Sequence, residues 1–334
     1  MSKPEDYAHS QVNEKLERLE RKIKKEYQKA SKEVKEKLND YLKQFEDEDK
    51  EMRAKLDKGD ISEANYFKWR KEKILTSQKW EKQKKELIDV YSNADRVARG
   101  IMNESVAEAY ALNRNYSTFI AEKKAKLDTS FTLYDKHTAM NLLKDNQKLL
   151  PKSSKKMTEA IRERKVKKWN DQKFQSAILQ GILQGESMDD IAKRLSETVG
   201  ELNAHSAIRN ARTATTSAEN AGRMDGLKEA QEKGINVKKI WLSTLDNRTR
   251  HEHVFLDGQK RDIDEPFEVY GDTIMFPGDP DAEPYLVYNC RCTLVEEVEG
   301  IDLDVADESM RNNKLGNMTY EEWKANHEEN VNEY

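Results

Sequence analysis

Apolar residues recur every three or four positions along the first part of the chain, and this spacing limits the folds open to it. The series, with lysine and glutamate between its members, is Val12, Leu16, Leu19, Ile23, Tyr27, Val34, Leu38, Leu42, Phe45, Met52 and Leu56. On a helix such residues form one apolar stripe with the spacing of a coiled coil. We therefore expect a long amphipathic helix that ends at Gly59.

A second helix with the same kind of stripe is predicted after this glycine. Asp60 and Glu63 have the spacing of a capping box, which starts a helix. Large apolar residues then follow at helical intervals: Tyr66, Trp69, Ile74, Trp80, Leu87, Tyr91 and Val97. Two such helices bury their stripes by packing antiparallel, so residues 1–150 are predicted to form an elongated helical hairpin or arm.

The composition favours long helices with narrow buried stripes over one large globular core. Apolar residues make up 36% of the 334 residues and charged residues 37%. The net charge of −4 excludes a generally basic nucleic-acid coat, so a DNA contact would need a local basic patch. The two cysteines form one Cys-x-Cys pair, which excludes a disulfide-stapled secreted scaffold. With no apolar run long enough for a membrane span and no signal peptide at the start, we expect no membrane partner and synthesis in a reducing cytoplasm.

Residues 151–233 are predicted to form a helical middle region that includes a basic helix. Between Lys152 and Lys173 there are nine lysines and arginines against three acids. A solvated helix face accounts for this composition. The alternative is a patch that contacts the phosphates of double-stranded DNA. Its candidate contacts are Arg162, Arg164, Lys165, Lys167 and Lys168.

A helix rich in alanine, serine and threonine is expected over residues 204–230. Its small side chains would let another backbone approach closely. Arg212, Glu219 and Arg223 share one of its faces. We expect an ion-pair network at this face, which docks the helix on the next domain.

After Gly234 the sequence changes character, and residues 234–300 are predicted to form a compact α+β module. Short runs of strand-forming residues at 237–242, 254–256, 274–276, 285–288 and 292–295 lie between glycine, proline and aspartate turns. Residues 301–334 are predicted to be a solvated acidic tail with one short helix capped at Thr319. The predicted fold class is therefore mainly α, with a helical arm, a helical middle region and a small C-terminal α+β module.

The module holds both cysteines within a cluster of uncommon residues. The cluster comprises Trp241, Asp246, Arg248, Arg250, His253, Asp257, Gly258, Asn289, Cys290, Arg291 and Cys292. We expect the module to fold as one unit in which residues 289–292 return beside residues 248–253, through turns at Gly258, Gly271 and Gly278. The arginines are expected to tie down loops by binding backbone carbonyls and carboxylates.

Two pairs of metal-ligating residue types occur in this cluster at matching spacing. His251 and His253 are two positions apart, as are Cys290 and Cys292. On an extended backbone such pairs project to the same side, so the four side chains are candidate ligands of a tetrahedral structural zinc ion. The alternative is that the cysteines pack as small core residues while the histidines join a polar network.

The order of these residues resembles the phage Mu protein F-like family, the minor head or head morphogenesis proteins of tailed bacteriophages. The resemblance rests on Trp-Leu-Ser-Thr-x-Asp-x-Arg-Thr-Arg-x-x-His-x-x-Leu-Asp-Gly from Trp241, Phe-Pro-Gly-Asp-Pro from Phe276 and Asn-Cys-Arg-Cys from Asn289. It extends over about residues 170–325. The single histidine of the family pattern corresponds to His253, so His251 is an addition.

The resemblance implies a protein that contributes to head assembly and to DNA packaging or delivery. The expected location is the interior of the virion capsid, with the host cytoplasm as the site of assembly. The expected partners are the portal protein, other head or scaffold proteins and double-stranded DNA. We expect no catalytic residue and no enzymatic activity. Some relatives carry fused toxin or enzyme domains, and we expect none after Cys292.

A metal-dependent nuclease or related hydrolase is the alternative function. It would use His251, Glu252, His253 and Asp257 in the C-terminal module. Such a site needs an open metal position and a general base. Neither requirement can be assigned from the sequence.

Overall fold

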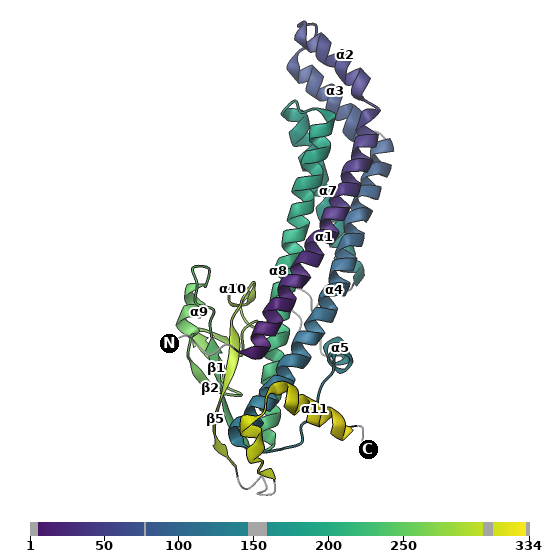
Figure 1. Cartoon of the computed structure of the whole chain (residues 1–334). Helices are drawn as coiled ribbons and strands as arrows, with labels where there is room; N and C mark the ends of the chain where they lie inside the picture. The colour runs from purple at the N-terminus through teal and green to yellow at the C-terminus, as the bar shows by residue number, and fades with distance from the viewer. Residues whose placement is uncertain (1–5, 77, 146–158, 303–309, 332–334) are drawn as a thin grey trace. The chain divides into compact units, whose positions relative to one another are not determined.

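The computed structural model of the chain describes residues 6–76, 78–145, 159–302 and 310–331, and these residues are mainly helical (Figure 1). The helices are α1 (Tyr7–Lys43), α2 (Glu46–Asp57), α3 (Glu63–Leu75), α4 (Gln78–Ala125), α5 (Lys136–Asp145), α7 (Glu159–Leu183), α8 (Met188–Glu232), α9 (His251–Leu256), α10 (Pro284–Val287) and α11 (Tyr320–Val331). The strands are β1 (Ile235–Leu242), β2 (Lys260–Asp262), β3 (Phe267–Val269), β4 (Asp272–Ile274) and β5 (Thr293–Ile301). The predicted fold class, mainly α with a small α+β module, is confirmed. None of the described helices is both long and apolar enough to cross a membrane.

The chain divides into two compact units. The module unit comprises Met1–Leu19, Met102–Lys156 and Arg209–Tyr334, and the helical unit comprises Glu20–Ile101 and Met157–Ile208. Helices α1, α4 and α8 each contribute residues to both units. The domain boundaries expected from the sequence, after residues 150, 233 and 300, stay predictions.

In the helical unit, the first long helix is shorter than its apolar stripe predicts. Helix α1 ends at Lys43 and α2 begins at Glu46, so the interruption comes before Gly59. The first turn of α2 carries four consecutive acids, residues 46–49, and negative charge stabilises the N-terminal end of a helix. A run of acids therefore favours a new helix start here. The stripe of α1 is buried as expected from its spacing, at Ile23, Tyr27, Val34, Leu38 and Leu42.

In the module unit, α8 approaches α4 very closely through its glycines. A Cβ atom added at Gly226 would lie 2.6 Å from the carbonyl oxygen of Arg114, and one at Gly222 would lie closer still to that of Tyr110. Both distances are far inside van der Waals contact. The small residues of α8 therefore allow the backbones of α8 and α4 to come into contact, as the composition of α8 predicts.

The strands of the module unit form a three-stranded antiparallel sheet and a separate hairpin. Strand β1 lies between β2 and β5, and its Trp241 is opposite Leu294. Strands β3 and β4 are joined through Tyr270 and Gly271, whose φ angles of 51° and 91° are those of a tight hairpin turn. The core beneath the sheet is continuous with residues of α4, α8 and α11.

Two of the expected strands are helices. Residues 254–256 belong to α9, and residues 285–287 belong to α10, which has Pro284 in its first turn. Apolar runs of three or four residues fit a strand or a buried helical turn equally well, and proline in a first turn favours the helix. Since His251 and His253 both lie in α9, their side chains do not point to the same side, because residues two apart on a helix do not face each other.

Within residues 310–331, the described part of the predicted acidic tail, the expected short helix is present, and it is not fully solvated because Tyr320 and Trp323 are buried. The Thr319 hydroxyl accepts a hydrogen bond from the backbone N–H of Glu322, whose carboxylate accepts one in return from the N–H of Thr319. This capping box starts α11. Trp323, 1% exposed, then packs into the core of the module unit and donates a 2.7 Å hydrogen bond to Glu122.

Candidate functional site

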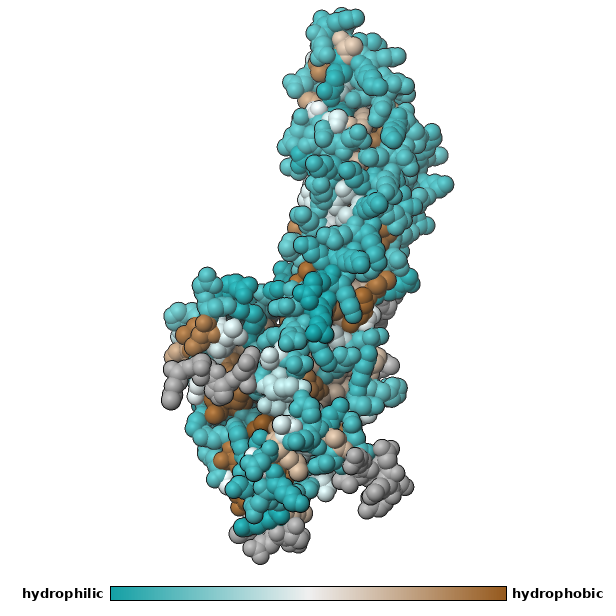
Figure 2. Space-filling model, viewed as in Figure 1, coloured by the Kyte–Doolittle hydropathy of each residue, from teal (hydrophilic) through white to brown (hydrophobic). Residues whose placement is uncertain are grey.

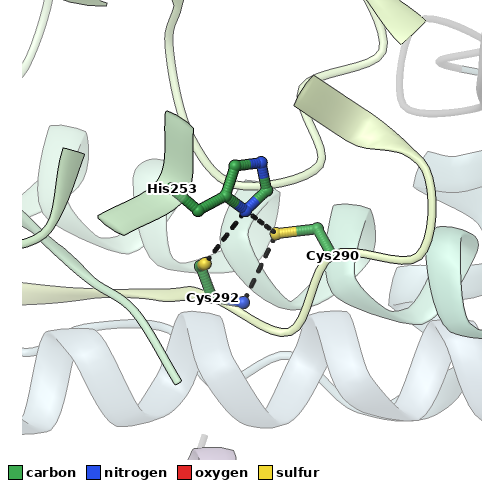
Figure 3. Close-up of side chains that lie close together, drawn as sticks. All are labelled: His253, Cys290 and Cys292. Atoms are coloured by element: carbon green, nitrogen blue, oxygen red, sulfur yellow. Dashed lines mark hydrogen bonds between the residues drawn. The ribbon is translucent and has the colours of Figure 1, made fainter. Parts of the chain in front are cut away.

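Three side chains from two segments that are 37 to 39 residues apart in the sequence converge in the module unit (Figure 3). His253 comes from α9, and Cys290 and Cys292 come from the segment that leads into β5. The His253 Nδ1 atom lies 3.5 Å from the Sγ of Cys290 and 3.3 Å from the Sγ of Cys292. Each residue is 2% exposed. We call this group the His-Cys-Cys cluster.

The orientation of the imidazole follows from its other nitrogen. His253 Nε2 lies 3.1 Å from the backbone carbonyl oxygen of Leu286 in α10. A carbonyl only accepts, so Nε2 carries the proton in this contact. In the neutral ring Nδ1 then holds a lone pair, and that lone pair faces the two sulfur atoms.

Ser243 and Asp257 hold α9 against the end of β1. The Ser243 hydroxyl donates to the carbonyl of His253 at 2.6 Å and accepts from the indole N–H of Trp241 at 3.0 Å. The Ser243 backbone N–H donates to Asp257 at 2.8 Å. Trp241 also packs edge-on against the His253 ring. The predicted cluster residues therefore meet, and Ser243 is a member that sequence reasoning missed.

The two thiols differ in their electrostatic surroundings. Burial raises the pKa of Cys290, whose Sγ accepts a hydrogen bond from the backbone N–H of Cys292. The hydrogen bond with Cys290 lowers the pKa of Cys292, and the neighbouring His253 and Ser243 act in the same direction. A negative charge in this pair is thus more stable on Cys292.

The arginines of the cluster anchor loops, as their positions beside turns suggest. Arg291 binds the carboxylate of Asp246 through two hydrogen bonds of 2.6 and 2.7 Å. Arg291 first, and then the backbone N–H of Arg248, hold the pKa of Asp246 well below its ordinary value. Arg250 donates to the carbonyl of Tyr288.

A small pocket opens beside the His-Cys-Cys cluster. It is lined by Arg212, Thr244, Arg248, Thr249, Arg250, His253, Asn289, Cys290, Arg291 and Cys292. Four of these residues are arginines. The pocket therefore favours water or an anion over a cation at the exposed side of the cluster.

Helix α8 fixes the cysteine segment through small polar side chains that the sequence analysis did not assign. Thr216 donates to the carbonyl of Cys290 at 2.8 Å, and the Thr213 hydroxyl accepts from the N–H of Asn289 at 3.0 Å. Asn220 donates to the carbonyl of Cys292 at 3.3 Å. The three side chains lie three or four residues apart, on one face of the helix. Small polar residues at this spacing indicate a helix face that contacts another segment, and these three residues could have been identified from that pattern.

The face of α8 that was expected to carry ion pairs does so at Arg223 and Glu219. Arg223, fully buried, donates to the Asp6 carboxylate at 3.0 Å and to the carbonyl of Leu294 at 2.9 Å. Although burial opposes ionisation of Asp6, Arg223 keeps the pKa of that carboxyl below its ordinary value. Glu219 binds His9 at 2.6 Å. Arg212, the third predicted residue, lines the pocket beside the cysteines.

His251 lies outside the cluster, which corrects the four-ligand interpretation. It is exposed, and its Nδ1 contacts the Tyr270 hydroxyl at 2.9 Å. The reason is the helical backbone of α9, on which residues 251 and 253 point to different sides. In the part of the chain that the structure describes, the nuclease set of His251, Glu252, His253 and Asp257 does not form a group of converging ligand atoms.

The candidate DNA contacts lie on α7 in the helical unit. Arg164, Lys165 and Lys168 are exposed, whereas Lys167 pairs with Glu163 at 3.0 Å and with Asp89 at 3.2 Å. Residues 151–158, which include the first lysines of the predicted basic helix, lie outside the described residues. The exposed cations are compatible with either of the two interpretations drawn from the sequence.

Comparison with known proteins relates the chain to one family and to two curated relatives. A family model described as "Phage Mu protein F like protein" matches residues 172–295, which contain α8 and the complete His-Cys-Cys cluster. A minor head protein, GP7, of Bacillus phage SPP1 is 28% identical over 201 residues, 60% of this chain and 62% of that protein. An NAD(+)–arginine ADP-ribosyltransferase, EFV, of Enterococcus faecalis is 30% identical over 210 residues, 62% of this chain and 41% of that protein. The chain thus spans less than two thirds of the length of either relative. No solved structure matches.

The second relative corrects the expectation that the chain is non-enzymatic. A protein 30% identical over 62% of this chain bears the name of an enzyme, so similarity to this sequence does not imply the absence of catalysis. The nuclease alternative gains no support from either relative, because neither is named as a nuclease.

Proposed function

Since residues 172–295 belong to the Phage Mu protein F like family, we propose that this chain is a minor head protein that contributes to head morphogenesis in a tailed bacteriophage. One observation carries the proposal: the matched segment contains the whole His-Cys-Cys cluster together with the part of α8 that holds it in place. The similarity to a protein named as a minor head protein supports the same conclusion.

The proposal includes a location and partners. The protein acts in the capsid interior, bound to the portal protein and to other head proteins, and it contributes to DNA packaging or delivery. Two observations support this. The matching family is one of phage head proteins, and the chain has an exposed apolar surface that is suited to contact with another protein. A protein built into an assembly needs such a surface.

The surface in question lies around α9 and the β3–β4 hairpin. Its exposed apolar side chains are Val254, Phe255, Tyr270 and Tyr285, which are 49%, 54%, 62% and 42% exposed. Phe255 and Tyr270 have ring centroids 5.3 Å apart. Figure 2 shows hydrophobic surface gathered where α9 lies in Figure 1. We call these four residues the α9 patch and propose that it contacts another head protein, because exposed aromatic side chains in a group are typical of protein interfaces.

Co-assembly tests the role and the surface together. The chain is expressed with the portal, scaffold and major capsid proteins of its phage, and the copies retained in purified procapsids are counted by mass spectrometry. Phe255→Glu with Tyr270→Ser is expected to lower the retained copies at least about tenfold, since two interface anchors are lost. Leu183→Glu, which changes a 58% exposed leucine of α7, is the matched control and should be retained normally.

The two possible failures are distinct. If the unaltered chain is never retained in procapsids, the proposed function is wrong. If it is retained but the double variant is retained equally well, the α9 patch is not the contact surface.

DNA contact through α7 is a separate proposal. Its support is the exposed cations on this helix, Arg164, Lys165 and Lys168. Changing Lys165, Lys167 and Lys168 to glutamate is expected to weaken binding to double-stranded DNA by about tenfold or more at low salt. It should also reduce the slope of log affinity against log salt by up to about 3, because counterion release scales with the phosphates neutralised.

The control changes three exposed lysines of α1 in the same way and so alters the net charge equally. These are Lys22, Lys25 and Lys29. If the α1 variant loses as much affinity as the α7 variant, binding follows total charge and α7 is not a specific patch. Unchanged DNA binding by the α7 variant would also remove the assignment.

A further inference from the structure

We propose that His253, Cys290 and Cys292 bind one zinc ion, in a site with three protein ligands and a fourth position that opens to the arginine-lined pocket. This site is independent of the proposed role in the phage head. In the part of the chain that the structure describes, the three ligand atoms lie within 4.8 Å of one another, and no other histidine, cysteine or acid joins them. All three residues are buried. Thiolate sulfur and imidazole nitrogen are the ligands that zinc prefers.

The distances match a tetrahedral ion. Zinc–sulfur bonds of about 2.3 Å and zinc–nitrogen bonds of about 2.0–2.1 Å, at a tetrahedral angle, place sulfur and nitrogen about 3.5 Å apart. The two observed separations between His253 Nδ1 and the cysteine sulfurs are 3.5 and 3.3 Å. One ion between the three atoms satisfies both separations at once.

Hydrogen bonding alone explains only one of the two sulfur contacts with Nδ1. Without a metal, the Cys292 thiol can donate to the Ser243 hydroxyl at 3.5 Å, which leaves the lone pair of Nδ1 to the Cys290 thiol. The shorter contact with Nδ1 is nevertheless that of Cys292, at 3.3 Å. A metal ion accounts for both contacts, because the nitrogen and the two thiolates then all act as donors to the same centre.

The surroundings have the features of the outer shell of a metal site. The Nε2–H of His253 is directed at the carbonyl of Leu286, which fixes the ring so that Nδ1 faces inward. The backbone N–H of Cys292 donates to the Sγ of Cys290 at 3.3 Å, a contact that stabilises a thiolate. Thr216 and Asn220 hold the carbonyls of the two cysteine residues. The ligands are therefore positioned before any ion binds.

The fourth position is supplied from the pocket. Two thiolates balance the charge of Zn²⁺, so no further protein anion is needed. The side chains that line the pocket are rich in arginine, and no acidic residue is among them. A water molecule or a small anion held by these arginines completes the coordination.

Zinc analysis of the full chain tests the site directly. The protein is produced without a histidine tag, freed of loose metal by gel filtration and analysed by mass spectrometry for bound metals. We expect about one zinc ion per chain, lost together with a decrease in thermal stability when a strong chelator is added. Protein that contains no zinc, takes up none when zinc is added, and unfolds at the same temperature with and without chelator would overturn the proposal.

Variants locate the ion. Cys290→Ser, Cys292→Ser and His253→Ala should each lose zinc, whereas His251→Ala should keep it. His251 is the matched control because it lies on the same helix, two residues away, with its side chain exposed. Zinc lost equally from the His251 variant, or retained in all three ligand variants, contradicts the assignment.

Cobalt substitution keeps the test decisive if the ligand variants fail to fold. Co²⁺ added to the metal-free unaltered chain should give a thiolate-to-cobalt charge-transfer band and the intense visible absorption of a tetrahedral site. Added zinc should abolish both, one equivalent being sufficient. Weak absorption of octahedral cobalt without a charge-transfer band would show that the cysteines bind no metal.

Discussion

Replacing Arg223 with alanine is expected to lower the free energy of unfolding by about 3–5 kcal/mol. The guanidinium is fully buried and binds the Asp6 carboxylate, the carbonyl of Leu294 and the side chain of Asn113, the last at 2.9 Å. Its removal takes the guanidinium donors from a strand carbonyl and from the Asp6 carboxylate, which then keeps, among the described residues, only the backbone N–H of His9 at 2.8 Å in a low-dielectric setting. That loss is larger than the net contribution of the ion pair itself.

Chemical denaturation followed by circular dichroism measures this effect. Arg209→Ala is the control, because Arg209 is an exposed residue of the same helix and its loss should change stability by no more than about 0.5 kcal/mol. Arg223→Lys should fall between the two, since an ammonium group keeps the charge but cannot reproduce the planar fork. Equal stabilities for the Arg223 and Arg209 variants would show that the buried network contributes nothing.

The second large effect is expected from Gly222→Ala in α8. The added methyl group would collide with the backbone carbonyl of Tyr110 in α4, and a backbone atom cannot turn aside as a flexible side chain can. The two helices must therefore separate, which weakens the packing between them. We expect a loss of about 3 kcal/mol, at the upper end of the usual cost of overpacking.

Gly100→Ala supplies a control with the opposite expected sign. Gly100 lies inside α4, and a Cβ atom there meets nothing within 4 Å. Alanine is favoured over glycine in a helix by up to about 1 kcal/mol, so this variant should be more stable than the unaltered chain. The midpoints of thermal unfolding of the Gly222→Ala and Gly100→Ala variants, compared with that of the unaltered chain, test both expectations. Stabilisation by both substitutions would mean that α8 and α4 are not in close contact at Gly222.

The helices of this chain could be predicted because their signals are local. Apolar stripes with a period between three and four residues, and capping residues such as Thr319, depend only on neighbours in the sequence. The end of α1 at Lys43 could not be read from the stripe, which continues past it. The run of acids at residues 46–49 favours the start of a new helix there, although the apolar spacing continues without a break.

The candidate site was predictable in its membership and less so in its geometry. His253, Cys290 and Cys292 were singled out by residue type and spacing, and the structure brings them together. The spacing of His251 and His253 places both side chains on one side only if the backbone is extended, and the short apolar run that follows does not distinguish a strand from a helical turn. The hydrogen bond between His253 and the Leu286 carbonyl could not have been predicted, since every residue has a backbone carbonyl and the sequence does not show which one is the acceptor.

The network around Arg223 shows the limit of reasoning from one helix. Arg223 and Glu219 were recognised as sharing a face of α8, but their partners Asp6 and His9 lie more than 200 residues earlier in the chain. Pairings across such separations depend on the tertiary fold. The Thr213, Thr216 and Asn220 side chains had the spacing of a helix face and could have been assigned to a buried contact on that ground.

Quantitative mass spectrometry of phage heads tests the central claim most directly. Heads from cells that produce the phage carrying this chain are separated from free protein on a density gradient, and each fraction is analysed for the chain, the portal and the major capsid protein. A minor head protein should sediment with the heads, in a fixed ratio to the portal and far below the number of major capsid copies. A chain found only among free proteins, while portal and capsid proteins sediment normally, would contradict the assignment.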